Sequence, residues 1–149
     1  MRQLLAIFAL SHICVISSAQ FSEPHILSMK DRAAVINQLL EDKVQNYLPE
    51  IMTREGIDMW VVMSREYNED PIIKTLLPAE WLAARRRTIL VFFNKPDGSG
   101  IETLAVARYN VGSTFKSAWN KEEQPNQWAR LAEIIRERNP QKIAVNKSQ

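Results

Sequence analysis

The longest regular pattern of apolar positions lies between residues 28 and 56. Apolar side chains recur there at spacings of three and four, the period of an amphipathic helix; they are Ala33, Ile36, Leu40, Val44, Tyr47 and Ile51. Ser28, with Asp31 three residues later, is a suitable N-cap, and Gly56 is a natural residue to follow the last turn. Pro49 removes a backbone donor within this pattern, so we expect the helix to break or kink there and to restart for a final turn.

Apolar runs of a second kind predict buried strands. Residues 57–63 are apolar except for Asp58, and residues 88–93 form a similar run, as expected for strands covered on both faces. Residues 101–109 follow a segment rich in turn-forming residues. We therefore expect the second and third strands to pair as a hairpin.

Two more helices and a last strand complete the predicted order. Pro78 can open a short helix that reaches about Arg86, and Pro125 fits the first position of another. The predicted buried stripe of this last helix consists of Trp128, Leu131, Ala132 and Ile135. Arg136 and Arg138 suit its C-terminal end, and Pro140 ends it. Residues 142–146 then begin a fourth strand. The pattern predicts an α/β domain with a mixed sheet flanked by helices, with a specialised loop at a strand end where ligand contacts tend to lie.

The first residues of the chain have the pattern of a secretory signal. Arg2 supplies the positive charge, residues 4–16 an apolar region, and residues 17–19 a small-residue cleavage site. The apolar region is shorter than the roughly 20 residues that a membrane-spanning helix needs. We therefore expect a secreted or periplasmic bacterial protein whose mature domain is residues 20–149, with no membrane association after cleavage.

Composition narrows the chemistry to be expected. With 19 Lys and Arg against 17 Asp and Glu, the net charge is +2, which gives no general reason to expect nucleic acid as a partner. The histidines are His12, in the signal segment, and His25, and the one cysteine is Cys14. A metal site needs several such ligands together, and no serine lies in a Gly-x-Ser-x-Gly motif. We therefore expect no metal ion, no cofactor and no catalytic residue in this chain.

Arg85, Arg86 and Arg87 form the sharpest basic feature, about one helical turn after Trp81. Three interpretations stay open for this run. It can be the solvated end of the short helix, where cations favour the helix dipole. It can be an ion-pairing contact between subunits or domains, or an anion-binding site, because guanidinium groups bind carboxylate or phosphate bidentately.

Two aromatic residues in predicted loops complete the candidate set. Trp119 precedes the last helix, and Tyr67 lies in the loop 64–71 that follows the first strand. With the three arginines, they are possible contacts of an interface or of a substrate entrance. The carboxylates that cluster at residues 66–70 and 122–123 are interpreted as solvated, because they lie in polar loops.

Several segments together resemble one protein family. Residues 56–63, GIDMWVVM, follow the long amphipathic helix, and residues 86–93 read RRTILVFF; further similar segments are 103–109, 115–124 and 128–133. This order resembles the N-terminal domain of the creatinase, prolidase and aminopeptidase P family, and more narrowly that of secreted bacterial Xaa-Pro aminopeptidase-like proteins. The resemblance implies a ribonuclease-H-like α/β domain. It covers nearly all of the predicted mature chain.

The same resemblance implies a second, "pita-bread" domain that cleaves the bond before proline. That domain holds two divalent metal ions on carboxylates and a histidine, and none of those positions has a counterpart in this sequence. The loop 64–71 also departs from the family's Tyr-Leu-Ser/Thr-Gly-Phe type of segment, so no substrate contact of that region is carried over.

Two functional hypotheses follow. The first is a non-catalytic N-terminal domain of a Xaa-Pro aminopeptidase-like metallopeptidase, which helps to assemble a homo-oligomer and shapes the entrance to an active site for peptides. Its partner would be the catalytic domain, and because the predicted last strand lies close to Gln149 we expect the chain to be a truncated piece of that protein. The second is a free-standing periplasmic binding or adaptor domain that has lost the enzyme.

Overall fold

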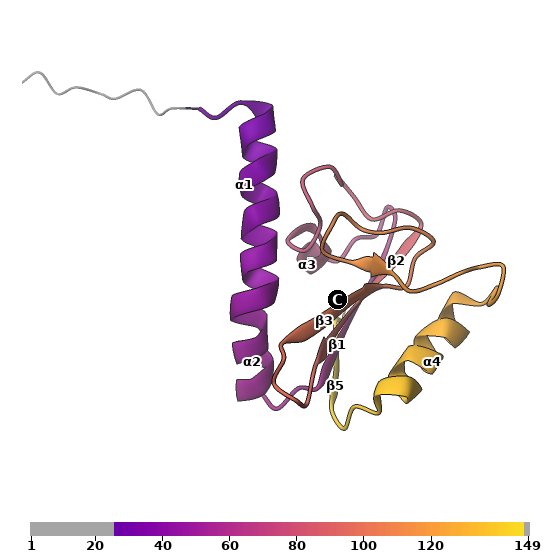
Figure 1. The fold of residues 1–149 in the computed structure, drawn as a ribbon. Coiled ribbons are helices and arrows are strands. Elements are labelled where there is room, and N and C mark those ends of the chain that lie inside the picture. Colours follow the sequence, from indigo (N-terminus) through magenta and orange to yellow (C-terminus); the bar gives the residue numbers. More distant parts are fainter. Residues whose placement is uncertain (1–25, 148–149) are drawn as a thin grey trace, which may run out of the picture.

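The computed structural model describes residues 26–147, which form a five-stranded mixed sheet with helices on both faces (Figure 1). The predicted α/β fold with a mixed sheet flanked by helices is therefore confirmed. The predicted signal segment, residues 1–19, lies outside the described residues. No helix within residues 26–147 is long and apolar enough to cross a membrane.

The strands follow the order β4-β3-β2-β1-β5 across the sheet. Their bounds are β1 Met59–Arg65, β2 Arg87–Asn94, β3 Ile101–Ala105, β4 Lys116–Ser117 and β5 Ile143–Val145. Strands β1, β2 and β3 form an antiparallel meander, so the predicted hairpin is confirmed, whereas β4 and β5 add at the two edges in parallel with β3 and β1. Strand β3 ends at Ala105, earlier than the predicted 109, and β4 lies in a segment that was predicted to be a loop.

Asp58, the polar exception in the first apolar run, joins the edge strand β5 to the sheet. Its carboxylate accepts hydrogen bonds from the backbone N–H groups of Gln141 and Lys142, at 2.7 and 2.8 Å. At the other end of β5, the Asn146 side chain accepts from the Met63 N–H at 2.8 Å and donates to the Met63 carbonyl at 3.0 Å. These side chains extend the short β1–β5 ladder beyond its three paired positions.

The long amphipathic helix is one rod in three parts, α1 (Met29–Asp42), a π-helical segment (Lys43–Tyr47) and α2 (Leu48–Arg54) (Figure 1). Ser28 accepts from the Asp31 N–H as the predicted N-cap. The predicted interruption occurs just before Pro49, as a π-helical segment, and an α-helix restarts at Leu48, but the chain stays helical throughout. Pro49 lies in the first turn of α2, directly after the π-helical turn, where its missing N–H is tolerated.

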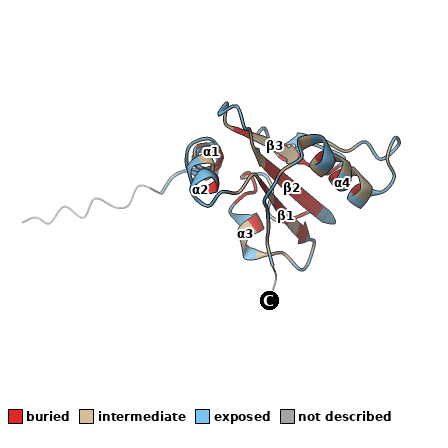
Figure 2. Ribbon diagram, turned by 90° about the horizontal axis from the view of Figure 1, so that it is seen from below, coloured by how far each residue is buried: buried red, intermediate tan, exposed pale blue. Residues whose placement is uncertain are grey.

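The two faces of the sheet carry separate apolar clusters (Figure 2). On one face, Val62, Leu90 and Phe92 pack with residues of α1, α2 and α3 (Pro71–Lys74); the helix contributions include Leu40, Val44, Met52 and Ile73. On the other face, Met59, Ile89 and Val91 pack against α4 (Gln127–Arg138) through Leu131 and Ile134. The predicted stripe of the long helix is only partly buried, because Ile36, Tyr47 and Ile51 keep 46%, 59% and 43% of their surface exposed.

The predicted helix over 78–86 is absent, and side chains from distant parts of the sequence bond to backbone donors near both ends of this segment. The N–H of Ala79 donates to the Asn37 side chain at 2.8 Å, and that of Arg86 donates to a Glu66 carboxylate oxygen at 3.0 Å. The segment runs instead through turns into β2. The three arginines are exposed, as the interpretation of a solvated helix end expects, but they do not lie at a helix end, so that part of the interpretation is wrong.

The last helix begins two residues later than predicted and presents a different face. Asn126 is its N-cap, and its buried residues are Gln127, Leu131 and Ile134. Trp128, predicted to be buried, is 45% exposed. The polar residue on the buried face has a structural reason, since the Gln127 side chain donates to the carbonyls of Val106 and Arg87 at 2.5 and 3.2 Å.

Candidate functional site

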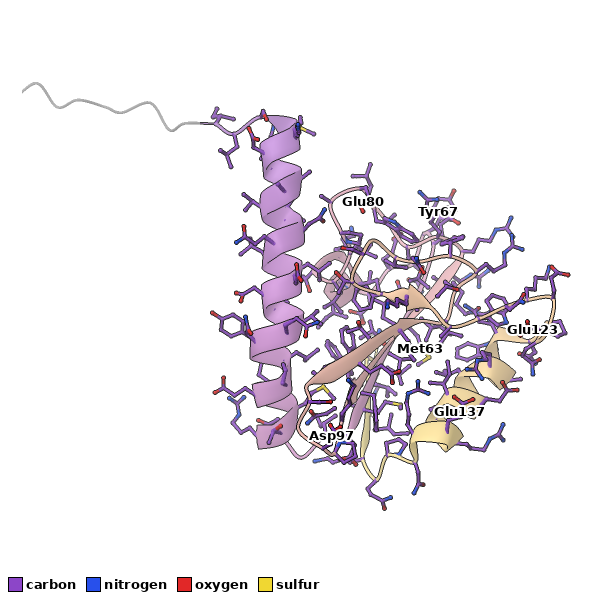
Figure 3. All side chains as sticks on the ribbon, in the orientation of Figure 1. Met63, Tyr67, Glu80, Asp97, Glu123 and Glu137 are labelled. Atoms are coloured by element: carbon purple, nitrogen blue, oxygen red, sulfur yellow. The ribbon has the colours of Figure 1, made fainter. Side chains whose placement is uncertain are left out.

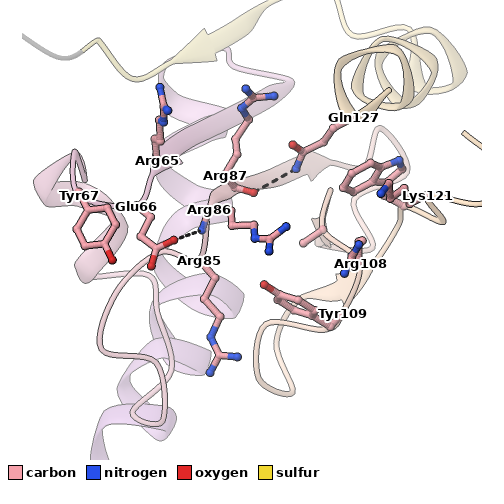
Figure 4. Close-up of a pocket in the computed structure, with 12 residues that line it drawn as sticks. Arg65, Glu66, Tyr67, Arg85, Arg86, Arg87, Arg108, Tyr109, Lys121 and Gln127 are labelled. Carbon is pink, nitrogen blue, oxygen red and sulfur yellow. Dashed lines mark hydrogen bonds between the residues drawn. The ribbon is translucent and has the colours of Figure 1, made fainter. Parts of the chain in front are cut away.

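A pocket of about 750 Å³ lies where the end of β1, the start of β2 and the segment after β3 meet (Figure 4). Its lining contains six cationic side chains: Arg65, Arg85, Arg86, Arg87, Arg108 and Lys121. Glu66 is the one carboxylate among the described lining residues, and Tyr67, Tyr109 and Trp119 are the aromatic ones. We refer to this site as the cationic pocket. Figure 3 shows Tyr67 at the opposite end of the molecule from Asp97, which lies in the β2–β3 turn.

The strand register brings two of the cations together. Arg65, the last residue of β1, is paired with Arg87, the first residue of β2. Like charges directly opposite one another in an antiparallel pair destabilise the sheet. An anion bound between these strand ends would relieve that repulsion.

Two residues beside the pocket have a left-handed backbone that is unusual for residues other than glycine. Tyr67 has φ of 67° and Arg86 has φ of 52°. The segments that carry them are joined by two hydrogen bonds, from the Glu66 N–H to the Arg86 carbonyl at 2.6 Å and from the Arg86 N–H to the Glu66 carboxylate. A left-handed conformation costs an L-residue about 1–2 kcal/mol, and such strain tends to collect at functional sites.

Aromatic rings position two of the arginines. The Arg85 guanidinium lies 4.8 Å from the centre of the Trp81 ring and 6.0 Å from that of Tyr109. The Arg87 guanidinium lies 4.7 Å from the centre of the Trp128 ring. A cation–π contact of this kind restrains a guanidinium group without forming a hydrogen bond to it, so N–H donors stay available for an anion.

The ion pairs of the described residues lie outside the cationic pocket. They involve Arg54 with Glu55, Arg130 with Glu133 and Glu137, and Arg138 with Glu102 and Glu137. Hydrogen bonding from Arg138 lowers the pKa of Glu102, and hydrogen bonding from Arg130 lowers the pKa of both Glu133 and Glu137. Arg130 and Arg138 of α4 are therefore matched by carboxylates of this chain, whereas the arginines of the cationic pocket are not.

Trp119 and the loop after β3 form the far wall of the pocket. The indole N–H of Trp119 donates to the Gln124 carbonyl at 2.6 Å, so its polar edge is satisfied within the chain. The loop that carries Arg108 and Tyr109 closes through hydrogen bonds between Val111 and Phe115. At Gly112, where φ is +61°, this loop approaches so closely that an added Cβ would lie 2.9 Å from the Pro78 ring.

All five candidates from the sequence line this one pocket: Tyr67, Arg85, Arg86, Arg87 and Trp119. Sequence reasoning missed five further charged or polar lining residues, Arg65, Glu66, Arg108, Lys121 and Gln127, together with Tyr109. Arg65 was within reach, because pairing the first two strands end to end places it opposite the arginine run. Arg108 and Tyr109 were hidden by the prediction that β3 extends to residue 109.

Within residues 26–147, no three His, Cys, Asp or Glu side chains gather so that they could hold a metal ion. No family model, no characterised protein and no solved structure matches this chain. The arrangement of the pocket is therefore the basis on which its chemistry can be judged. Six cations and one carboxylate are suited to holding an anion.

Proposed function

We propose that this chain is the non-catalytic N-terminal domain of a Xaa-Pro aminopeptidase-like protein of the creatinase family. In this proposal its cationic pocket contacts acidic groups of a neighbouring subunit or of the catalytic domain, at the entrance to the active site. The single observation that supports it best is the pocket itself, in which six cations face one carboxylate. Groups of this kind recognise and orient, because guanidinium groups are permanent charges that do not transfer protons at neutral pH.

The topology supports the ribonuclease-H-like arrangement that the resemblance implies. An antiparallel meander, β1 to β3, is followed by a helix and by a strand that pairs in parallel with β1. The pocket lies at the end of that sheet where β1 finishes. In the proposed parent protein, the divalent metal pair belongs to the catalytic domain, the assembly is a homo-oligomer, and the protein is secreted or periplasmic.

Assembly of the full-length parent tests this proposal. The Arg86→Ala variant should form fewer oligomers in light scattering while its turnover of Xaa-Pro peptides by assembled enzyme changes little. Arg136→Ala, which removes an exposed cation at the far end of α4, is the matched control and should assemble normally. Unchanged assembly with lost turnover in Arg86→Ala would contradict the proposal.

The second hypothesis, a free-standing periplasmic binding or adaptor domain, stays as the alternative. The cationic pocket would then be its binding site, formed by the ends of β1 and β2, the loop after β3 and the start of α4. Reading the gene beyond the codon for Gln149 distinguishes the two: an immediate stop codon in an intact gene favours the free-standing domain, and a continuing frame with the family's metal ligands favours the first.

A further inference from the structure

We propose that the cationic pocket binds an acidic peptide segment, through two or more Asp or Glu carboxylates spaced along an extended chain. This inference rests on the proposed function, in which the pocket contacts acidic groups of a partner, and it names the chemistry of what is bound. Four features support it. No ion pair of the described residues neutralises the cations of the pocket, and two of its guanidinium groups lie against aromatic rings. The arginines are also spread over the pocket, and several backbone donors beside it are already bonded.

The charge of the pocket is not neutralised by the chain itself. Glu66 is the one carboxylate among the described lining residues, and it already accepts a hydrogen bond from the Arg86 N–H. None of the six lining cations takes part in an ion pair of the described residues. Cations collected in a hollow raise the local concentration of anions and speed their association.

The guanidinium groups are prepared for carboxylates. Arg85 and Arg87 place their guanidinium groups against the rings of Trp81 and Trp128, and these contacts restrain the two side chains before a ligand arrives. Their edge donors can then bind a carboxylate bidentately, and less side-chain freedom is lost on binding. Arginines prepared in this way suit planar carboxylate groups.

The arginines spread over the pocket instead of converging on one point. In Figure 4, Arg87 and Arg85 extend in opposite directions, and Arg86 lies between them and reaches toward Arg108 and Tyr109. A volume of about 750 Å³ far exceeds that of a single carboxylate group. A ligand that engages several of these groups must therefore carry separated negative charges, as an acidic peptide does.

Phosphate-rich ligands fit less well, because several of the backbone donors beside the pocket are already bonded. Phosphate sites commonly use free N–H groups of loops and helix starts. Here the Glu66 N–H donates to the Arg86 carbonyl, and the Arg86 N–H donates to the Glu66 carboxylate. The N–H groups at the start of α4 donate to the Asn126 side chain.

Fluorescence anisotropy with the purified protein tests the inference. The probe is a short fluorescein-labelled peptide that alternates Glu and Gly, with both termini blocked, and its neutral counterpart alternates Gln and Gly. We expect saturable binding of the acidic probe, none of the neutral one, and affinity that falls as salt is added. Arg86→Gln and Arg108→Gln should each weaken binding by about tenfold or more, whereas the charge-matched Arg136→Gln should stay within about twofold of the wild type.

Circular dichroism of each variant establishes that it is folded, and the two pocket variants serve as independent tests. Tighter binding of inorganic pyrophosphate or of a single-stranded oligonucleotide than of the acidic peptide would overturn the inference. An equal loss in Arg136→Gln would also overturn it, because the binding would then reflect net charge alone. If the acidic peptide fails to bind but Arg86→Ala still impairs assembly of the parent, this inference fails and the proposed function stands. If the acidic peptide binds but Arg86→Ala leaves assembly unchanged, the proposed function fails and this inference stands.

Discussion

Alanine substitutions at two glycines with the same φ angle can measure how tightly the loop beside the pocket packs. Gly56 and Gly112 both have φ of +61°. Gly56 follows α2, where its N–H and that of Ile57 bond to the carbonyls of Thr53 and Met52, and a Cβ added to it would meet nothing within 4 Å. A Cβ added to Gly112 would lie 2.9 Å from both Cβ and Cγ of Pro78.

Alanine at the two positions should therefore have different costs. At Gly56, the left-handed conformation costs about 1–2 kcal/mol, and reduced freedom of the unfolded chain returns about 0.4–1 kcal/mol, which leaves a loss of about 1 kcal/mol. Gly112→Ala carries the same loss and an overpacking penalty of about 1–3 kcal/mol. We expect the free energy of unfolding to fall by about 1 kcal/mol in Gly56→Ala and by about 2–4 kcal/mol in Gly112→Ala.

Urea unfolding followed by far-UV circular dichroism measures both values. The slope of the unfolding free energy against urea concentration should be the same as in the wild type. The Gly112→Ala variant should also bind the acidic peptide more weakly, because the loop that is displaced from Pro78 carries Arg108 and Tyr109. Gly56→Ala, which is remote from the pocket, should bind as the wild type does. Equal losses of stability in the two variants would refute the close approach of Gly112 to Pro78.

Three further outcomes follow from the described contacts. In Glu102→Gln the free energy of unfolding should fall less steeply than in the wild type as the pH is lowered. Arg138 lowers the pKa of folded Glu102 below its ordinary 4.5, so the wild-type contribution is present above that value and is lost as pH falls through the lower folded pKa; a constant difference in unfolding free energy from about pH 6 to about pH 3 would contradict this. Asn146→Ala removes bonds to Met63 and Asp70 and should cost about 1–3 kcal/mol, with faster hydrogen exchange in β5; unchanged exchange there would count against it. Calorimetry of the isolated protein with manganese, cobalt or zinc should show no stoichiometric site of micromolar affinity, and finding one would contradict the view of a non-catalytic domain.

Local patterns predicted the elements whose hydrogen bonds are themselves local. The long helix with its Ser28 cap and the β2–β3 hairpin follow from spacing and turn residues close in sequence. The edge strand β5 was predicted from its apolar residues, but its pairing with β1 is not local. The predicted helix over 78–86 is absent, and the contacts of that segment are not local. Backbone donors near its two ends bond to Asn37 and Glu66, which lie far away in the sequence and could not be anticipated from the pattern.

The local pattern also failed to predict which face of α4 is buried. An apolar pattern places Trp128 inside, but Gln127 takes the buried position because two strand-end carbonyls need a donor. Trp128 then becomes the exposed partner of Arg87. The arginine run was visible in the sequence, whereas the rings that position it and the cations that join it come from other segments.

The claim that the cationic pocket is the binding site of this domain is tested most directly by an NMR titration with the acidic peptide. The prediction is that chemical-shift changes concentrate on the backbone amides of Glu66, Arg86 and Arg108 and on the indole N–H of Trp119, and that Arg86→Gln abolishes them at the same peptide concentration. Changes centred on the α1–α2 rod or on the far end of α4, or changes that persist unaltered in Arg86→Gln, would contradict the claim.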